Sequence, residues 1–451
     1  MTALRAGCLN IWEVLAQSIA MLGPTLTPVL IVPLMFASAG NASWLAYALG
    51  SLMLLAVALN VREFATRSSS AGSLYDYAHR AFGVRGSALC GWALIWSYAF
   101  VCIAGLTGFA VFARALAPLT HVNLAPIVAL CIVLSVAMIL AYRDIRLSTI
   151  TMLALEAGSI TLILVLFGFV LARHGSIVDP EQLHLHGGTL SGVALGTTIA
   201  IFSLVGFESA TSLGEEAHDP RRTIPRAVIL SVGISGAFFI FCAYVEVLGA
   251  RGLASPLDKL GTPLDALADA ARVPALKYAI DAGALLSSFS IALAALNAGA
   301  RVVFDMGRSG VFPRALARTH PTYLTPNVAL AIFGAISGII GGGMLAGGIA
   351  PIDAFNDTAT LGSFGFVAIY TFVALGAPIY LYRIGELRRR NIALSAFTLA
   401  LLFVPAIGSL YPVPVPPNDR FPYIFAAYAL VGAIVLWRRV RSEQVLEPDP
   451  A

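Results

Sequence analysis

The stretch VLAQSIAMLGPTLTPVLIVPLMFASAGNASWLAYALGSLMLLAVALNV, residues 14–61, decides the fold because it contains no charged side chain. A helix needs about 20 consecutive apolar residues to cross the hydrocarbon core of a bilayer. The stretch is more than twice that length and is divided near Ala39-Gly40-Asn41. It therefore predicts two membrane crossings in succession.

Similar apolar runs recur along the rest of the chain. Of its 451 residues, 58% are hydrophobic and 12% charged, whereas about 25% of the residues in an ordinary soluble domain are charged. Further spans are expected near 86–113, 124–142, 148–172, 190–213, 227–249, 278–305, 326–348, 358–382, 391–410 and 421–437. The sequence thus predicts an all-α integral membrane protein with twelve transmembrane helices, in which residues 1–451 form a single transmembrane domain.

The basic residues indicate how the chain is oriented. Lys and Arg are enriched in cytoplasmic loops, and with twelve spans 21 of the 28 basic residues lie on the side that carries both termini. We therefore expect both termini in the cytoplasm and the protein in the cell membrane, surrounded by lipid, as a monomer or homodimer. The net charge of +4 is too small and too scattered to indicate nucleic-acid binding.

Nothing in the sequence indicates a metal, a cofactor or an enzyme. The five cysteines form no CxxC pair, and the seven histidines fall in loops or at the edges of spans, so neither a disulfide nor a zinc site is expected. The longest loops, near 62–85 and 250–277, contain no HExxH, GxSxG or P-loop motif. We expect no resident metal or cofactor and no catalytic site.

Two of the spans are interrupted in their middle. The first contains Gly23-Pro24-Thr25-Leu26-Thr27-Pro28, and the sixth contains Gly206 beside the ionisable Glu208. A spanning helix tolerates such breaks only where the freed backbone groups face protein or a water-filled cavity. Interrupted spans that lie five helices apart are typical of two inverted repeats around a site near the midplane. The alternative is that the prolines merely kink the first helix.

Glu156 and Glu208 are the carboxylates that the sequence places deepest in the bilayer. A charge at that depth costs several kcal/mol unless it is protonated, paired or hydrated, so both are candidates for function. Other acidic residues lie closer to the ends of spans, and we interpret them as structural: Glu246, Asp281 and Asp305. Arg301 has the i, i+4 spacing for an ion pair with Asp305.

The segment FSLVGFESATSLGEEAHDPRRTIPRA, residues 202–227, resembles the sixth-helix signature of the amino acid-polyamine-organocation superfamily. Two further segments, SSSAGSLYDYAHRAFG at 68–83 and FDMGRSGVFPRALARTHPTYLTPNVAL at 304–330, resemble that family's loops before the third helix and after the eighth. The three segments occur in the family's order, and the resemblance covers nearly the whole chain.

The resemblance implies a LeuT-type fold with a 5+5 inverted repeat. Residues 11–182 would form the first repeat, 188–385 the second, and 391–438 two extra C-terminal helices. It also implies secondary transport of an amino acid or related amine, with the substrate held by the broken helices. By position, the family's Gly-Ser-Gly falls on Leu26-Thr27-Pro28, the aromatic lid on Phe202, and the gating or proton-linked glutamate on Glu208.

The departure from Gly-Ser-Gly widens the expected substrate class, because Pro28 has no N–H and Leu26 adds bulk. We expect the N–H groups and hydroxyls around the first break to hold a carboxylate, and the carbonyls near the second break to hold an ammonium. The residues assigned to this substrate site are Gly23, Thr25, Leu26, Thr27, Ser97, Phe202, Ser203, Gly206 and Ser290, and Tyr98 and Phe364 are further candidates for selectivity.

The sequence allows three interpretations of the ion coupling. The fifth span lacks the lysine of several proton-coupled relatives and contains Glu156 and Ser159 instead. A membrane carboxyl can bind and release protons near neutral pH, which favours H⁺ carried by Glu156 or Glu208. Na⁺ bound by carbonyls of the first helix with Ser287, Ser288 or Ser290 is the alternative, and exchange without net ion coupling is the third.

Three other classes of membrane protein are compared with this interpretation. A membrane enzyme would need a cluster of catalytic residues, which the sequence lacks. A major-facilitator carrier would need a long loop after the sixth span, where this chain has a short one. A receptor or assembly subunit built on the same fold is distinguished only by measuring flux.

Overall fold

The computed structural model describes residues 3–68, 70–260, 262–411 and 413–442, and its regular structure there is helical apart from one isolated β-bridge between Leu9 and Ala217. In chain order the helices are α1 (Ile11–Leu22), η1 (Thr27–Ile31), α2 (Val32–Ala39), η2 (Gly40–Ala42), α3 (Ser43–Ala65), α4 (Leu74–Ala115), α5 (Ala117–Thr120), α6 (Pro126–Arg143), α7 (Ile145–His174), α8 (Pro180–Leu183), α9 (Leu190–Leu204), η3 (Phe207–Leu213), α10 (Pro220–Gly249), η4 (Leu257–Lys259), α11 (Pro263–Ala270), α12 (Ala275–Arg308), η5 (Arg314–Ala317), α13 (Asn327–Ala346), α14 (Pro351–Arg383), α15 (Arg389–Gly408), η6 (Asn418–Arg420) and α16 (Phe421–Ser442).

Eleven segments of the described chain are long and apolar enough to cross a membrane. The first, Ile11–Ala65, has 55 residues. At 1.5 Å per residue a continuous helix of that length would be about 80 Å long, more than twice the thickness of a bilayer core. It also turns back at Gly40, which has a positive φ of 54°. This segment therefore makes two crossings, and the total of twelve agrees with the prediction.

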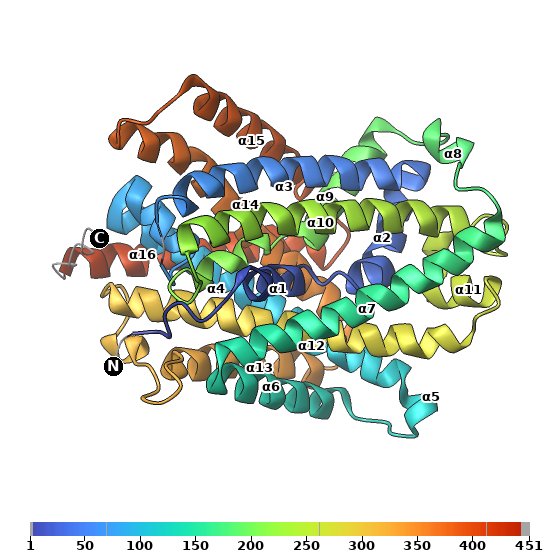
Figure 1. Cartoon of the computed structure of the whole chain (residues 1–451), viewed down its shortest axis with the longest axis horizontal. Coiled ribbons are helices and arrows are strands. Elements are labelled where there is room, and N and C mark those ends of the chain that lie inside the picture. Colours follow the sequence, from blue (N-terminus) through green and yellow to red (C-terminus); the bar gives the residue numbers. More distant parts are fainter. Residues whose placement is uncertain (1–2, 69, 261, 412, 443–451) are drawn as a thin grey trace.

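The long helices run side by side, so the bundle has two ends (Figure 1). The described N-terminal residues and the end of α16 lie at one end, together with Leu9 and Ala217, and we call this end the terminal face. The short helices α5, α8 and α11 lie at the opposite end. An even number of crossings accounts for this arrangement.

The centre of the bundle is formed by α4 and α12, which are the most buried spans. The most extensive packing of α4 is against α14 and α12, α10 packs on α3, and α7 packs on α12. By contrast, α6, α15 and α16 are largely exposed, as expected for helices that face lipid. The last two correspond to the two extra C-terminal helices, whereas the bounds of the two repeats stay a prediction.

Candidate functional site

The two interrupted spans meet inside the bundle. The helix α1 ends at Gly23 with a positive φ of 59°, and α9 is separated from η3 by Gly206 with a φ of 93°. A Cβ atom on Gly206 would lie 2.3 Å from Met21 Cγ, and one on Gly23 would lie 2.4 Å from Ile291 Cδ1. Only glycine allows this backbone conformation and this approach, so both breaks are fixed by the sequence.

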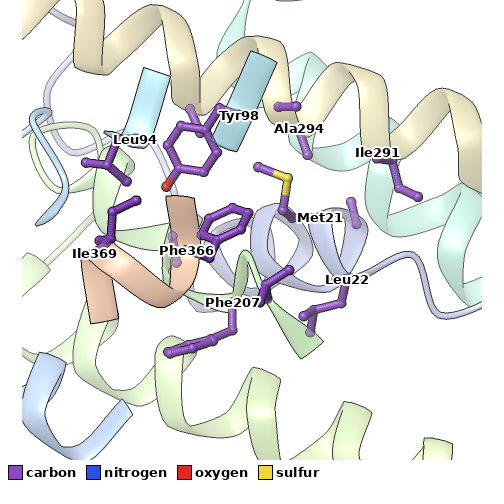
Figure 2. Close-up of a cluster of buried hydrophobic side chains, with 14 of the residues drawn as sticks. Met21, Leu22, Leu94, Tyr98, Phe207, Ile291, Ala294, Phe366 and Ile369 are labelled. Atoms are coloured by element: carbon purple, nitrogen blue, oxygen red, sulfur yellow. The ribbon is translucent and has the colours of Figure 1, made fainter. Parts of the chain in front are cut away.

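Apolar side chains fill the space around this junction in the conformation described. Figure 2 shows Met21 and Leu22 of α1 beside Phe207 of η3, with Phe366 of α14 and Tyr98 of α4 nearby. All five side chains are buried. The junction is therefore packed closed, and a substrate would have to displace these side chains.

Most backbone donors at the first break already have partners. The Leu26 and Thr27 N–H groups donate to the Gly23 carbonyl at 3.0 and 3.3 Å, and the Gly23 N–H donates to Ala20 O at 3.2 Å. The expectation that these N–H groups are free for a substrate carboxylate is therefore corrected, because the chain closes a tight turn around Gly23. The Thr25 hydroxyl is fully buried without a hydrogen-bond partner among the described residues, so it is a donor that a ligand could use.

The second break is organised around Glu208, which is completely buried. Its Oε1 accepts a hydrogen bond from the Tyr98 hydroxyl at 3.0 Å, and its Oε2 accepts one from the Tyr370 hydroxyl at 2.6 Å. The Tyr370 oxygen also accepts the Gly206 N–H at 3.1 Å. Helices α4 and α14 thus hold the carboxyl with hydroxyls, and the described residues provide no cation for it.

Tyr370 is the residue of this candidate site that was not found from the sequence. It lies in α14, 162 positions from Glu208 in the sequence, so no local spacing connects the two. The signal that could have found it is a tyrosine inside an apolar span, since a buried phenol O–H needs a partner.

A second polar group joins α7 to α12. The Ser287 hydroxyl donates to Glu156 Oε2 at 3.1 Å, while Glu156 Oε1 is buried without a partner among the described residues. Ser290 lies three positions after Ser287, on the same face of its helix, and its hydroxyl is also buried and unpartnered. Ser159 donates to the Gly283 carbonyl at 3.1 Å. The structure therefore brings four of the predicted coupling residues together.

Ser288 does not join this group. Its hydroxyl donates to Ala284 O at 2.8 Å within its own helix and lies beside Gly108 of α4. Ser287 and Ser288 therefore face different neighbours, because adjacent residues on a helix point about 100° apart. The sodium site considered with Ser287, Ser288 or Ser290 therefore stays a prediction.

Three predicted side chains lie against α14 and its neighbours. Ser97 is buried without a hydroxyl partner, close to Gly365 of α14. Phe202 and Phe364 line a cavity of about 330 Å³ that is formed by α9, α14, α15 and α16, and no residue of α1 or η1 lines it. Phe202 as a lid therefore stays a prediction. Ser203 lies closer to the break and shares a hydrogen bond with the Tyr47 hydroxyl at 3.1 Å.

Buried and half-buried ion pairs lie at the terminal face. Arg301 makes a bidentate ion pair with Glu216, at 2.6 and 2.8 Å, and both side chains are almost completely buried. The expected pair between Arg301 and Asp305 is wrong, because Asp305 binds Arg308 at 2.6 Å and the guanidinium of Arg301 reaches across to the segment after η3. Sequence spacing detects only partners on the same helix.

The same face ties the two interrupted spans to each other. The Leu9 N–H donates to Glu216 O at 3.0 Å, and the His218 N–H donates to Leu9 O at 2.7 Å. Glu13 of α1 also pairs with Arg146 of α7 at 2.9 Å. These contacts connect the beginning of α1 to the segment after η3 and to α7.

Among known proteins, the chain matches the amino acid permease family model over residues 9–436. The low-affinity putrescine importer PlaP of Escherichia coli (strain K12) is 28% identical over 377 residues, which cover 81% of this chain and 78% of PlaP. The branched-chain amino acid permease BcaP of Lactococcus lactis subsp. cremoris is 27% identical over 392 residues, which cover 82% of this chain and 80% of BcaP.

Among solved structures, a manganese transporter of Eremococcus coleocola is similar in fold, with a TM-score of 0.57 at 14% identity over 96% of this chain and 94% of that one. The resemblance to the amino acid-polyamine-organocation superfamily is thus confirmed by the family model and by the fold. The chain belongs to the amino acid permease family.

Proposed function

We propose that this permease is a proton-coupled symporter that moves an amino acid or related amine across the cell membrane by alternating access. The observation that carries the proposal is the environment of Glu208, a fully buried carboxyl beside the Gly206 break that is bound by two tyrosine hydroxyls and by no cation of the described chain. A carboxyl buried in this way is favourable in two forms. It can be protonated and neutral, or it can be ionised with an ammonium group beside it.

The geometry of the breaks supports a substrate with an amino group. The backbone carbonyls at the end of α9, near Ser203, and the carboxyl of Glu208 are acceptors that an ammonium can use. On the other side of the junction, the Thr25 hydroxyl is a buried donor without a partner in the described chain. A substrate carboxylate would bind there, but this site is weaker than a pair of free N–H groups.

Two features support H⁺ over Na⁺ as the coupling ion. Glu156 has one oxygen without a partner in the described chain, which favours the protonated acid at this depth. Of the serine hydroxyls considered for sodium, those of Ser287 and Ser290 lie on the side of Glu156, whereas that of Ser288 faces α4, so the three do not all converge on one point. Sodium coupling and exchange are outcomes that the test below separates.

The terminal face is proposed to be cytoplasmic, which is supported by the 21 basic residues on that side of the chain. Its ion pairs, together with the closed junction, describe a conformation shut on that side. An impermeant thiol reagent applied to intact cells should therefore not label a cysteine added after the last residue. Labelling there would reverse the proposed orientation.

The test uses purified protein in proteoliposomes, with labelled putrescine and leucine as the first two probes because the two relatives above carry those classes of solute. Uptake is measured under an inward proton gradient, under an inward sodium gradient, and as counterflow without a gradient. We expect accumulation with the proton gradient alone. Accumulation that requires sodium, or counterflow without any accumulation, would contradict proton coupling.

The variant Glu208→Gln sharpens this test, because it removes the titrating group but keeps its shape. We expect it to lose proton-driven accumulation, whereas counterflow of the same probe should weaken but persist, because the amide carbonyl can still accept a hydrogen bond from an ammonium. Glu181→Gln, an identical change at an exposed carboxylate of α8, is the matched control. Binding of a probe without any flux by the wild-type protein would favour a receptor.

A further inference from the structure

A cavity of about 410 Å³ lies between α4, α12, η5, α13 and α16, and the function proposed above does not use it. Every residue that lines it is aliphatic or aromatic. The lining residues of α13 include Ile332, Ile336 and Ile340, which are exposed on the outside of the bundle, whereas α4 is one of the two most buried spans. The cavity is therefore a groove that leads from the lipid-facing surface to the centre of the bundle, and we call it the α4–α13–α16 groove.

The side chains that line the groove have no donor to offer to a ligand, because their polar atoms already have partners. Trp92 Nε1 donates to Tyr428 O at 3.0 Å, and the Tyr428 hydroxyl donates to Trp92 O at 2.9 Å. Trp96 Nε1 donates to Leu361 O at 2.7 Å. A polar group inside the groove would lose its hydration without gaining these donors. The part of a ligand that enters it must therefore be hydrocarbon.

The groove lies in the half of the membrane next to the terminal face. Phe312 and Leu316, in the segment that follows α12, line it at that end. Along α13, which begins at Asn327, the lining residues run from Ile332 to Ile340. At 1.5 Å per residue these positions are about 8 and 20 Å from the start of the helix. The groove thus extends from the terminal face to about the middle of the membrane, as one lipid chain does.

The segment at the terminal-face end of the groove is basic. Residues 309–326, which join α12 to α13, include Arg314 and Arg318 and no acidic residue. Each arginine is two positions from Leu316, which lines the groove, and both are exposed. Apolar walls with cations at the headgroup end are complementary to an anionic phospholipid, whose chain is apolar and whose phosphate is negative.

We propose that the α4–α13–α16 groove binds one anionic phospholipid from the leaflet at the terminal face. An acyl chain lies against Trp92, Trp96 and α13, and the phosphate is held by Arg314 and Arg318. Because the lipid binds the folded protein and not the unfolded chain, it stabilises the fold. This binding site goes beyond the transport proposed above, and it depends neither on the substrate nor on the coupling ion.

The experiment uses the two tryptophans of the groove as reporters. The chain contains five tryptophans, so the parent variant Trp12→Phe/Trp44→Phe/Trp437→Phe retains Trp92 and Trp96. This variant is reconstituted in phosphatidylcholine bilayers, and phospholipid with brominated acyl chains, which quenches the tryptophans that it contacts, is added in steps. We expect brominated phosphatidylglycerol to reach half-maximal quenching at a mole fraction about tenfold lower than brominated phosphatidylcholine.

A change in the headgroup site should remove this preference. In the parent background, Arg314→Gln/Arg318→Gln should bring the two brominated lipids to the same half-quenching mole fraction. The matched control is Arg221→Gln/Arg226→Gln, the same change at two exposed arginines of α10 on the terminal face, and it should retain the tenfold difference.

A change in the groove itself should weaken the binding of both lipids. Ile336→Gln places an amide in the wall of the groove, so quenching by both brominated lipids should require a higher mole fraction. Ile339→Gln is the matched control, because Ile339 is an exposed residue of the same helix that does not line the groove. It should leave quenching as in the parent variant.

Equal half-quenching mole fractions for the two lipids in the parent variant overturn the inference, and so does a preference that survives Arg314→Gln/Arg318→Gln. Loss of the preference in the α10 control also overturns it, since the lipid then responds to the overall charge of the terminal face. Absence of quenching together with sedimentation as a dimer would assign the groove to a second copy of the chain.

If the parent variant fails to fold, the unfolding midpoint of the protein with all five tryptophans decides. Phosphatidylglycerol should raise this midpoint more than phosphatidylcholine does in mixed micelles, and Arg314→Gln/Arg318→Gln should abolish the difference. An equal effect of the two lipids rejects the site. None of these measurements involves transport, so a failure here is distinct from a failure of the proposed function.

Discussion

Buried carboxyls at the terminal face and buried carboxyls within the bundle have different partners. Glu216 at the terminal face is matched by two nitrogens of the Arg301 guanidinium, Nε and Nη2. Glu208 has only two tyrosine hydroxyls, and Glu156 has one oxygen without a partner in the described chain. A matched pair stays ionised and fixes structure, whereas an unmatched carboxyl gains and loses a proton at lower cost. The comparison separates a carboxyl that is fixed by an ion pair from the carboxyls that are proposed to bind protons.

The largest expected effect comes from breaking the matched pair. In Arg301→Ala, Glu216 would remain as a buried charge without its cation, and its side chain is only 1% exposed. We expect a loss of about 3 to 5 kcal/mol in the free energy of unfolding. The measurement is the thermal unfolding midpoint of the detergent-solubilised protein.

The control for this prediction is Glu208→Gln, which removes a carboxyl that has no ionic partner and should leave the midpoint nearly unchanged. The double variant Arg301→Ala/Glu216→Ala should recover part of the loss, because no charge is left unmatched. If Arg301→Ala unfolds at the wild-type temperature, the terminal face is not held by this pair.

The second effect concerns the two tyrosines of Glu208. Tyr370→Phe removes a donor from Glu208 and an acceptor from the Gly206 N–H, whereas Tyr98→Phe removes a single bond of 3.0 Å. Unsatisfied buried groups cost about 1 to 3 kcal/mol each, so we expect uptake to fall about tenfold or more in Tyr370→Phe and about threefold in Tyr98→Phe. Initial uptake rates in proteoliposomes measure both. A larger defect in Tyr98→Phe would mean that Tyr370 is not the main support of the break.

The fold could be predicted from the sequence because its causes are local. The absence of charge over residues 14–61 requires two crossings, and the glycines and prolines of the first span require a break. The burial of Glu156 and Glu208 could be predicted for the same reason, because an ionisable residue within an apolar run is recognised without knowing its partner.

The partners could not be predicted, because they are distant in the sequence. Arg301 and Glu216 are 85 positions apart in the sequence. The sequence therefore indicated the nearby Asp305 as the partner of Arg301, which is wrong. The N–H groups of Leu26 and Thr27 were expected to be free, since nothing in the sequence shows that Gly23 turns its carbonyl toward them. The complete burial of Glu246 was not predicted either, because burial, and not distance from the end of a helix, decides whether a carboxyl is solvated.

A smaller effect is expected from two adjacent serines that differ in their neighbours. Ser287→Ala removes the hydroxyl that donates to Glu156, whereas Ser288→Ala removes one that bonds only within its own helix. We expect Ser287→Ala to change proton-driven uptake by about threefold, with Ser288→Ala close to the wild type. The pH dependence of uptake is the measurement. Equal effects of the two variants would exclude Glu156 from coupling.

The smallest effect is expected at Asp179, a carboxyl outside the spans that pairs with Arg251 at 3.0 Å. Burial raises the pKa of Asp179, but hydrogen bonds from Gln182 and Arg251 outweigh burial and hold the pKa below its usual value. A carboxyl with a lowered pKa in the folded state stabilises the protein above its unfolded pKa, near 4, and this contribution is lost as the pH falls through the lower folded value. Because Arg251 is about one-third exposed, we expect Asp179→Asn to cost no more than about 1 kcal/mol at pH 7. The difference in unfolding midpoint between Asp179→Asn and the wild type should therefore shrink as the pH is lowered toward 3. A difference that grows on acidification would show that this pair does not stabilise the ionised form of Asp179.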